Sequence, residues 1–169
     1  MSGLTLSPLI GKSYSSIYGQ TAPSNKVKVA LIGCRSMGYG DLNTFLDYPE
    51  TECVALCDVD DEWLNKRAAD VEKKTGKKVP HLYKDWRRVI DNKDVDVVII
   101  GTPDHWHCLP TVWACQAGKD VYVEKPLSNT IEECNLMEKA ARKYNRIVQV
   151  GQWQRSDPVS YTHLTLPTT

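Results

Sequence analysis

The sequence predicts an α/β fold in which a doubly wound parallel sheet of the Rossmann type is covered by helices on both faces. Between residues 26 and 151, short β-rich runs alternate with stretches of helical periodicity, the pattern of βαβ units. Several of these runs are continuously apolar, as strands covered on both faces should be. A glycine turn follows the first run, where this fold places its phosphate site.

Five strands are expected, each a short apolar run bounded by turn residues. They cover residues 27–32, 52–58, 95–101, 120–124 and 146–150.

Three helices have clear end signals. Residues 60–74 open with three acidic side chains and close with two lysines before Gly76, which suits the helix dipole and the C-terminal glycine preference. A second helix begins after Thr130, which can form a capping box with Glu133. A third covers about residues 109–117 and is stopped by Gly118.

Length and charge narrow the possible partners. The chain has 169 residues, 41% of them hydrophobic, which is enough for one sizeable core. Lysine plus arginine (21) balance aspartate plus glutamate (21), so no overall charge draws the protein to nucleic acid or to an anionic membrane. No apolar run approaches the roughly 20 residues of a membrane-spanning helix. We therefore expect a small-molecule partner, with no nucleic acid and no membrane.

The two ends of the chain differ from its middle. Residues 1–25 are rich in serine, glycine, proline and threonine, and we interpret them as a leader or linker. Residues 3–20 are compatible with the remnant of an export signal, so localisation stays open between the cytoplasm and the periplasm. The predicted domain covers residues 26–158, and residues 159–169 form a separate tail.

The six cysteines are interpreted as mostly buried small hydrophobic residues. Cys53 and Cys57 lie on one expected strand with their Cα atoms roughly 13 Å apart, too far for a disulfide. The others are scattered, and no Cys-x2-Cys pair occurs. We expect neither a disulfide nor a structural metal.

The glycine turn departs from the dinucleotide fingerprint at one position. Gly33 and Gly38 match the first and third glycines, but Arg35 occupies the middle one. Arg35 therefore either points outward or contributes its charge to the phosphates. Taken alone, the turn is equally compatible with an ordinary strand-to-helix connection. With Ser36 and Met37, these residues are the candidate phosphate site.

Asp58 supports the nucleotide interpretation. It ends the second expected strand, 25 positions after Gly33 (58 minus 33), near the roughly 20-residue offset of a carboxylate that binds the adenosine ribose. The alternative is that Asp58 only begins the next turn. A carboxylate here would repel a 2'-phosphate, so we expect NAD rather than NADP, although Arg35 or Lys66 would be able to accommodate a phosphate.

Residues 101–108 follow the most apolar run and are expected to face the cofactor. Thr102 and Pro103 form the turn, Trp106 offers a flat apolar surface, and His107 offers a donor near the nicotinamide side. His105, His107 and Cys108 are potential metal ligands. They crowd into four residues with no second cluster, so we expect no metal.

Lys125 lies where the fifth apolar run stops, at the edge where open α/β sheets place their chemistry. It is either a solvated charge or a positioned proton donor. Pro126 favours an extended backbone at Lys125. A fixed ammonium can stabilise the oxyanion that develops when a secondary alcohol loses hydride.

Together these residues resemble the Gfo/Idh/MocA oxidoreductase family, which includes glucose-fructose oxidoreductase and inositol dehydrogenases. The resemblance covers about residues 26–158 and rests on the turn from Gly33 to Gly38, Cys57-Asp58, Thr102-Pro103 with His107, Ala117-Gly118-Lys119, and Glu124-Lys125-Pro126. It implies a Rossmann domain followed by a larger α/β substrate domain, which we expect to be absent from these 169 residues.

The resemblance also implies roles for individual residues. Glu124 and Lys125 would lie at the nicotinamide, with Lys125 bonded to the substrate hydroxyl, and Gln152 would also face the cofactor. The implied activity is NAD(P)-dependent hydride transfer at a secondary alcohol of a sugar, inositol or related polyol, by a homo-oligomer. The catalytic base would belong to the absent domain, so we predict no turnover for this chain alone.

Two other functions stay open. The first is an NAD-dependent glycosidase of the same superfamily, with which residues 104–107 are compatible but Lys125 is not. The second is a non-catalytic module that binds a dinucleotide. Residues 159–169 do not fit the family and resemble translated sequencing-adapter read-through, so His163 receives no catalytic role.

Overall fold

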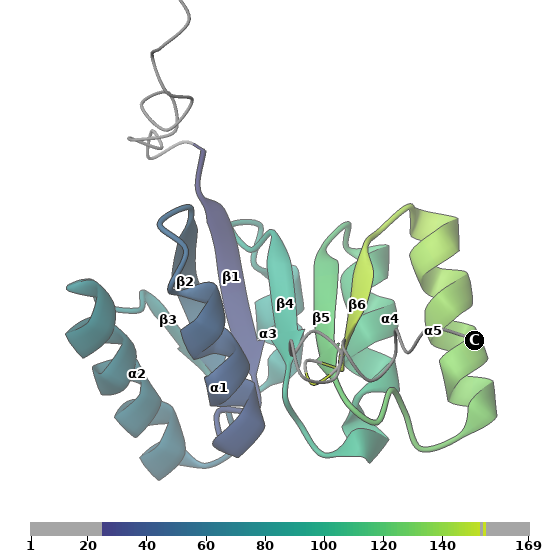
Figure 1. Ribbon diagram of the computed structural model, residues 1–169, viewed down its shortest axis with the longest axis horizontal. Coiled ribbons are helices and arrows are strands. Elements are labelled where there is room, and N and C mark those ends of the chain that lie inside the picture. Colours follow the sequence, from purple (N-terminus) through teal and green to yellow (C-terminus); the bar gives the residue numbers. More distant parts are fainter. Residues whose placement is uncertain (1–24, 153, 155–169) are drawn as a thin grey trace, which may run out of the picture.

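The computed structural model describes residues 25–152 and residue 154. These residues form a six-stranded parallel sheet in the order β3-β2-β1-β4-β5-β6 (Figure 1). Strand order reverses between the neighbours β1 and β4, which is the switch point of a doubly wound sheet. The predicted Rossmann-type fold is confirmed. Residues 1–24 of the predicted leader and the predicted tail, residues 159–169, lie outside the described residues.

Five strands form where the apolar runs predict them. They are β1 (Val27–Ile32), β2 (Thr51–Cys57), β4 (Val97–Ile100), β5 (Asp120–Glu124) and β6 (Val148–Gly151). The remaining strand, β3 (His81–Tyr83), lies at the edge of the sheet. The sequence pattern does not predict it, because three residues are too few to show a period.

Five α-helices accompany the strands. They are α1 (Ser36–Phe45), α2 (Asp61–Thr75), α3 (Trp86–Asp91), α4 (Cys108–Gln116) and α5 (Ile131–Tyr144). Asp60 caps α2 by accepting from the Glu62 N–H, and Gly76 ends it with φ +72°. The capping box of Thr130 and Glu133 is present at α5. The short α3 is not predicted by the sequence.

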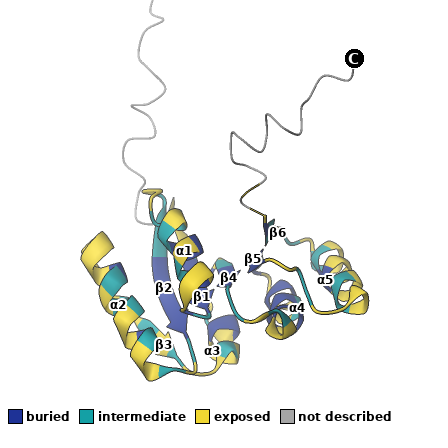
Figure 2. Ribbon diagram, turned by 60° about the horizontal axis from the view of Figure 1, so that its bottom comes forward, coloured by how far each residue is buried: buried dark blue, intermediate teal, exposed yellow. Residues whose placement is uncertain are grey.

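The core lies in two layers, one on each face of the sheet. Alternation along β1 sends Val29 and Leu31 to the face of α1 and α2, and Ala30 and Ile32 to the face of α3, α4 and α5. Figure 2 shows the buried strands between helices whose outer faces are exposed. The continuous apolar runs therefore reflect burial on both faces, as predicted.

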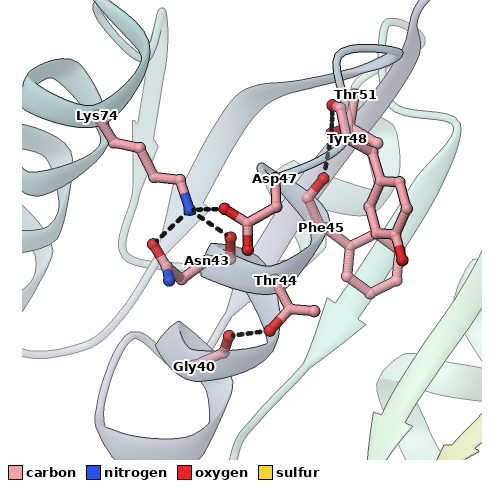
Figure 3. Close-up of polar contacts among 8 residues, drawn as sticks. All are labelled: Gly40, Asn43, Thr44, Phe45, Asp47, Tyr48, Thr51 and Lys74. Atoms are coloured by element: carbon pink, nitrogen blue, oxygen red, sulfur yellow. Dashed lines mark hydrogen bonds and ion pairs between the residues drawn. The ribbon is translucent and has the colours of Figure 1, made fainter.

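The C-terminal end of α1 is tied to its surroundings by side-chain hydrogen bonds (Figure 3). Lys74, at the end of α2, donates to the backbone oxygen of Asn43 at 2.7 Å and to Asp47 Oδ1 at 2.6 Å. Thr51, at the start of β2, donates to the Tyr48 carbonyl at 2.8 Å. These contacts orient α1, whose opposite end faces the glycine turn.

Candidate nucleotide-binding site

The glycine turn lies against the loop that follows β4. Gly33 has φ +90°, and a Cβ there would be 2.7 Å from the carbonyl carbon of Gly101. A Cβ on Gly38 would be 2.3 Å from the Gly33 carbonyl oxygen. Both positions require glycine because backbone fills the space. Gly101 is packed as tightly, and the only sequence signal for it is its position at the end of an apolar run.

The N-terminus of α1 offers backbone donors to an anion. Arg35 is the N-cap residue, with an extended backbone and no side-chain capping hydrogen bond. The first turn holds no acidic residue, and Ser36 and Met37 are exposed. Helix N-terminal N–H groups and the helix dipole favour phosphate at such a position. The turn is therefore compatible with the predicted pyrophosphate site.

Asp58 binds the glycine turn and also begins the next one. Its Oδ2 accepts from the Cys34 N–H at 2.7 Å, and its Oδ1 accepts from the Asp60 N–H at 3.0 Å. A carboxylate has about four lone-pair positions, so acceptor capacity remains for ribose hydroxyls. The carboxylate thus fixes the shape of the site in addition to any contact with a nucleotide.

Arg35 extends from the glycine turn toward Asp60 and Trp63. Its guanidinium pairs with the Asp60 carboxylate and lies 5.4 Å from the centre of the Trp63 ring. The hydrogen bond from Arg35 is the largest of the effects that hold the pKa of Asp60 below its ordinary value. Lys66 and Arg67 also lie over Trp63. Arg35 is also one of the residues that line the candidate cleft, so a contribution of its charge to the phosphates stays a prediction.

A cleft of about 660 Å³ opens at the carboxyl ends of β1, β2 and β4. It brings the glycine turn, Asp58 and the loop after β4 together, although these segments are far apart in the sequence. Residues 84–87, which follow β3, also line the cleft. They are not part of the predicted site because the sequence does not predict β3. Residues from the other segments that line the cleft include Gly33, Arg35, Asp58, Asp60, Thr102, Pro103, His105 and Trp106.

His107 connects the loop after β4 to the loop after β5. The ring is 1% exposed, with Nδ1 2.7 Å from the Pro126 carbonyl oxygen and Nε2 2.8 Å from the Thr102 carbonyl oxygen. Both ring nitrogens thus face backbone acceptors. These contacts brace the two loops, which meet because β4 and β5 are neighbours in the sheet. The donor role of His107 near the nicotinamide stays a prediction.

Lys125 and Gln152 follow the adjacent strands β5 and β6, and both are exposed. Glu124 is buried beside them, and its Oε2 accepts from the Lys125 N–H at 3.1 Å. The peptide bond between Lys125 and Pro126 is cis. Parallel strands bring these residues to the same edge of the sheet as Gly33, Asp58 and Thr102.

The cysteines pack as hydrophobic residues. Five are buried and Cys134 is partly buried, and all six are free thiols. Burial raises the pKa of Cys53 and Cys57 to about 12, so neither is a nucleophile at neutral pH. Within the described residues, no three His, Cys, Asp or Glu side chains are grouped so as to hold a metal ion. In the same part of the chain, no helix combines the length and apolar character needed to cross a membrane.

Residues 27–152 match the family model described as "Oxidoreductase family, NAD-binding Rossmann fold", GFO_IDH_MocA. A curated relative, glycosyl hydrolase family 109 protein 1 of Shewanella sp. (strain ANA-3), is 31% identical over 132 residues. That match covers 75% of this chain and 28% of the relative.

Solved structures agree on the fold. An NAD binding oxidoreductase from Klebsiella pneumoniae aligns with a TM-score of 0.70 and 28% identity, covering 81% of this chain and 37% of that one. Myo-inositol 2-dehydrogenase from Lactobacillus plantarum aligns with a TM-score of 0.71 and 27% identity, covering 82% and 40% respectively. The chain therefore belongs to the Gfo/Idh/MocA oxidoreductase family, of which it contains the NAD-binding Rossmann domain.

Proposed function

We propose that this chain binds a nicotinamide dinucleotide along the carboxyl edge of its sheet and serves hydride transfer at a secondary alcohol of a sugar, inositol or related polyol. The observation that carries the proposal is the meeting of the glycine turn, Asp58 and the Thr102 loop in one cleft, with Lys125 at the same edge. When bound, the nicotinamide accepts or returns the hydride.

Contacts within the cleft support NAD over NADP. The Asp58 and Asp60 carboxylates lie together at the end of β2, where an adenosine ribose would bind. The Arg35 guanidinium is already paired with Asp60, which reduces its availability to a 2'-phosphate. A preference for NADH over NADPH follows.

Lys125 is proposed to act on the substrate. Its side chain is exposed, while its backbone is held by Glu124 and by the loop that His107 braces at Pro126. A positioned ammonium can hydrogen-bond the substrate hydroxyl and stabilise negative charge on that oxygen. The partner base is proposed to belong to a substrate domain, because the chain spans 28% of the curated relative that it matches.

An NAD-dependent glycosidase is the second candidate, favoured by the glycosyl hydrolase family 109 names of the curated relatives. Both candidate functions use the same cofactor-binding domain and differ in the product that is released. When this domain is joined to a substrate domain, a ketone product supports the oxidoreductase, whereas a hydrolysed glycoside supports the glycosidase.

Calorimetric titration of the 169-residue chain with NADH and NADPH tests the cofactor proposal. Asp58→Ala removes a ribose acceptor and two hydrogen bonds that shape the turn, so we expect NADH affinity to fall roughly tenfold or more. Asp94→Ala, an exposed aspartate paired with Lys28, is the matched control. Lys125→Ala should change NADH affinity far less than Asp58→Ala. The proposal fails if the chain does not bind NADH, or if Asp58→Ala binds it as tightly as the control.

A further inference from the structure

Two acidic side chains meet on the face of the sheet that α1 covers. Asp41, on α1, is 9% exposed, and Glu124, the last residue of β5, is 4% exposed. Alternation along β5 places Glu124 on the same face as Tyr122, which packs with α1 and α2. Acidic groups this buried need partners, and no basic side chain within residues 25–152 pairs with either carboxyl.

The carboxyl oxygens of Asp41 and Glu124 can hydrogen-bond to each other only if one of the two groups carries a proton. Asp41 Oδ2 and Glu124 Oε1 are both buried and have no N–H or O–H partner among the described residues. The two carboxyl groups lie close enough for the charge of Glu124 to contribute to the raised pKa of Asp41. Two ionised carboxylates only accept, so a hydrogen bond between them requires that one be protonated. One proton satisfies both buried oxygens.

The neighbouring strand leaves room for the pair. Gly151 of β6 lies opposite Glu124, and a Cβ at that position would be 2.5 Å from Glu124 Oε1. Any larger residue would therefore displace the carboxyl group. The other oxygen, Oε2, accepts from the Lys125 N–H, so Glu124 connects Asp41 to the backbone of Lys125.

The electrostatic surroundings agree with a single charge on the pair. Burial, followed by the charge and hydrogen bond of Glu124, raises the pKa of Asp41 to about 7. Burial, together with Asp41 and Glu124, raises the pKa of Tyr122 to about 12, so that hydroxyl stays neutral. The basic residue that follows Glu124 in the sequence is Lys125, and its side chain is exposed.

We propose that Asp41 and Glu124 share one proton, and that Asp41 is a positioning residue that holds Glu124 against the Lys125 backbone. The shared proton keeps one negative charge, instead of two, beside the Lys125 turn. Its loss leaves two like charges in contact, which displaces Glu124 and loosens the turn. The role assigned to Asp41 in cofactor binding rests on the proposed function, whereas the shared proton does not.

Infrared spectroscopy of the 169-residue chain tests the shared proton directly. At about pH 6 most exposed carboxyl groups are ionised, so we expect a residual protonated-carboxyl band that disappears as the pH rises above about 8. Asp41→Asn should lack this band, while the control Asp91→Asn, at an exposed aspartate, should keep it. A wild-type spectrum without the band, or a band retained in Asp41→Asn, would refute the shared proton.

Unfolding as a function of pH gives a second readout. Because the folded pKa of Asp41 is raised, the folded state holds an extra proton between about pH 4 and about pH 7. Stability should therefore fall as the pH rises through this range and level off above it. In Asp41→Asn, stability should no longer fall over this pH range. A fall as steep as that of the wild type would contradict the proposal.

Comparing substituents tests the positioning role. The amide of Asp41→Asn can still donate to Glu124 Oε1, whereas Asp41→Ala leaves that oxygen without a donor. We expect Asp41→Ala to raise the unfolding equilibrium constant at about pH 6 roughly tenfold or more, and to weaken NADH binding more than Asp41→Asn does. Equal behaviour of the two variants would overturn the positioning role. If the wild type does not bind NADH, the proposed function fails. The infrared carboxyl band and the pH dependence of stability still test the shared proton in that case.

Discussion

At the scale of single residues, polar side chains at the carboxyl edge fix the backbone of the site. Asp58 accepts two backbone N–H groups, and His107 faces two backbone carbonyls. The sequence indicates that both residues belong to the site. It does not indicate their partners, because each contact joins loops that meet only after strands pair. Asp41 carries no sequence signal, since its partner Glu124 lies 83 positions away (124 minus 41).

Replacing His107 tests its bracing role. His107→Ala removes a buried ring and two contacts that join the loops after β4 and β5, so we expect the free energy of unfolding to fall by about 3 kcal/mol. His105→Ala is the matched control, because that ring is exposed, and it should change stability by about 0.5 kcal/mol or less. Urea unfolding of both variants measures the difference. Equal effects would show that the loops do not depend on the ring.

At the scale of elements, local signals predict the helices that have clear ends. The acidic start of α2 and the capping box of α5 are visible in the sequence and are present in the structure. Among the elements that the sequence does not predict, β3 and α3 have three and six residues. Their positions follow from pairing with β2 and packing against it, so no local pattern marks them.

The capping box of α5 should be measurable as a coupled pair. Thr130 accepts from the Glu133 N–H, and the Glu133 carboxylate accepts from the Thr130 N–H. We expect Thr130→Ala to lower the free energy of unfolding by about 1 kcal/mol, and the double variant with Glu133→Ala to lose less than the sum of the single variants. Asn135→Ala, an exposed change within α5, is the control. Strictly additive losses would contradict a reciprocal box.

At the scale of the whole molecule, the switch point between β1 and β4 makes the site. It brings the glycine turn against Gly101 and opens the cleft toward the loops after β2 and β3. Solved relatives share this arrangement over most of this chain but extend well beyond it. The domain can therefore hold a cofactor, while the substrate site is proposed to require a second domain.

Cofactor binding should stabilise the whole domain if the cleft is the site. A ligand that binds only the folded state adds about 2.7 kcal/mol at a concentration of 100 times its Kd. We therefore expect NADH to raise the unfolding midpoint in a concentration-dependent way, and adenosine alone to do so less. The same scan on Asp58→Ala serves as the control. A midpoint that does not move as the NADH concentration rises would contradict binding of NADH to the folded domain.

The sequence by itself determines the fold class and five of the six strands of the described sheet, and it places the candidate site residues near the ends of those strands. These follow from local causes: apolar runs, glycine at positions crowded by backbone, and helix end signals. Only the tertiary structure decides the partners of Asp58 and His107, the part played by residues 84–87, and the meeting of Asp41 with Glu124. Those contacts join segments that are distant in the chain, and their geometry exists only once the parallel strands are in register.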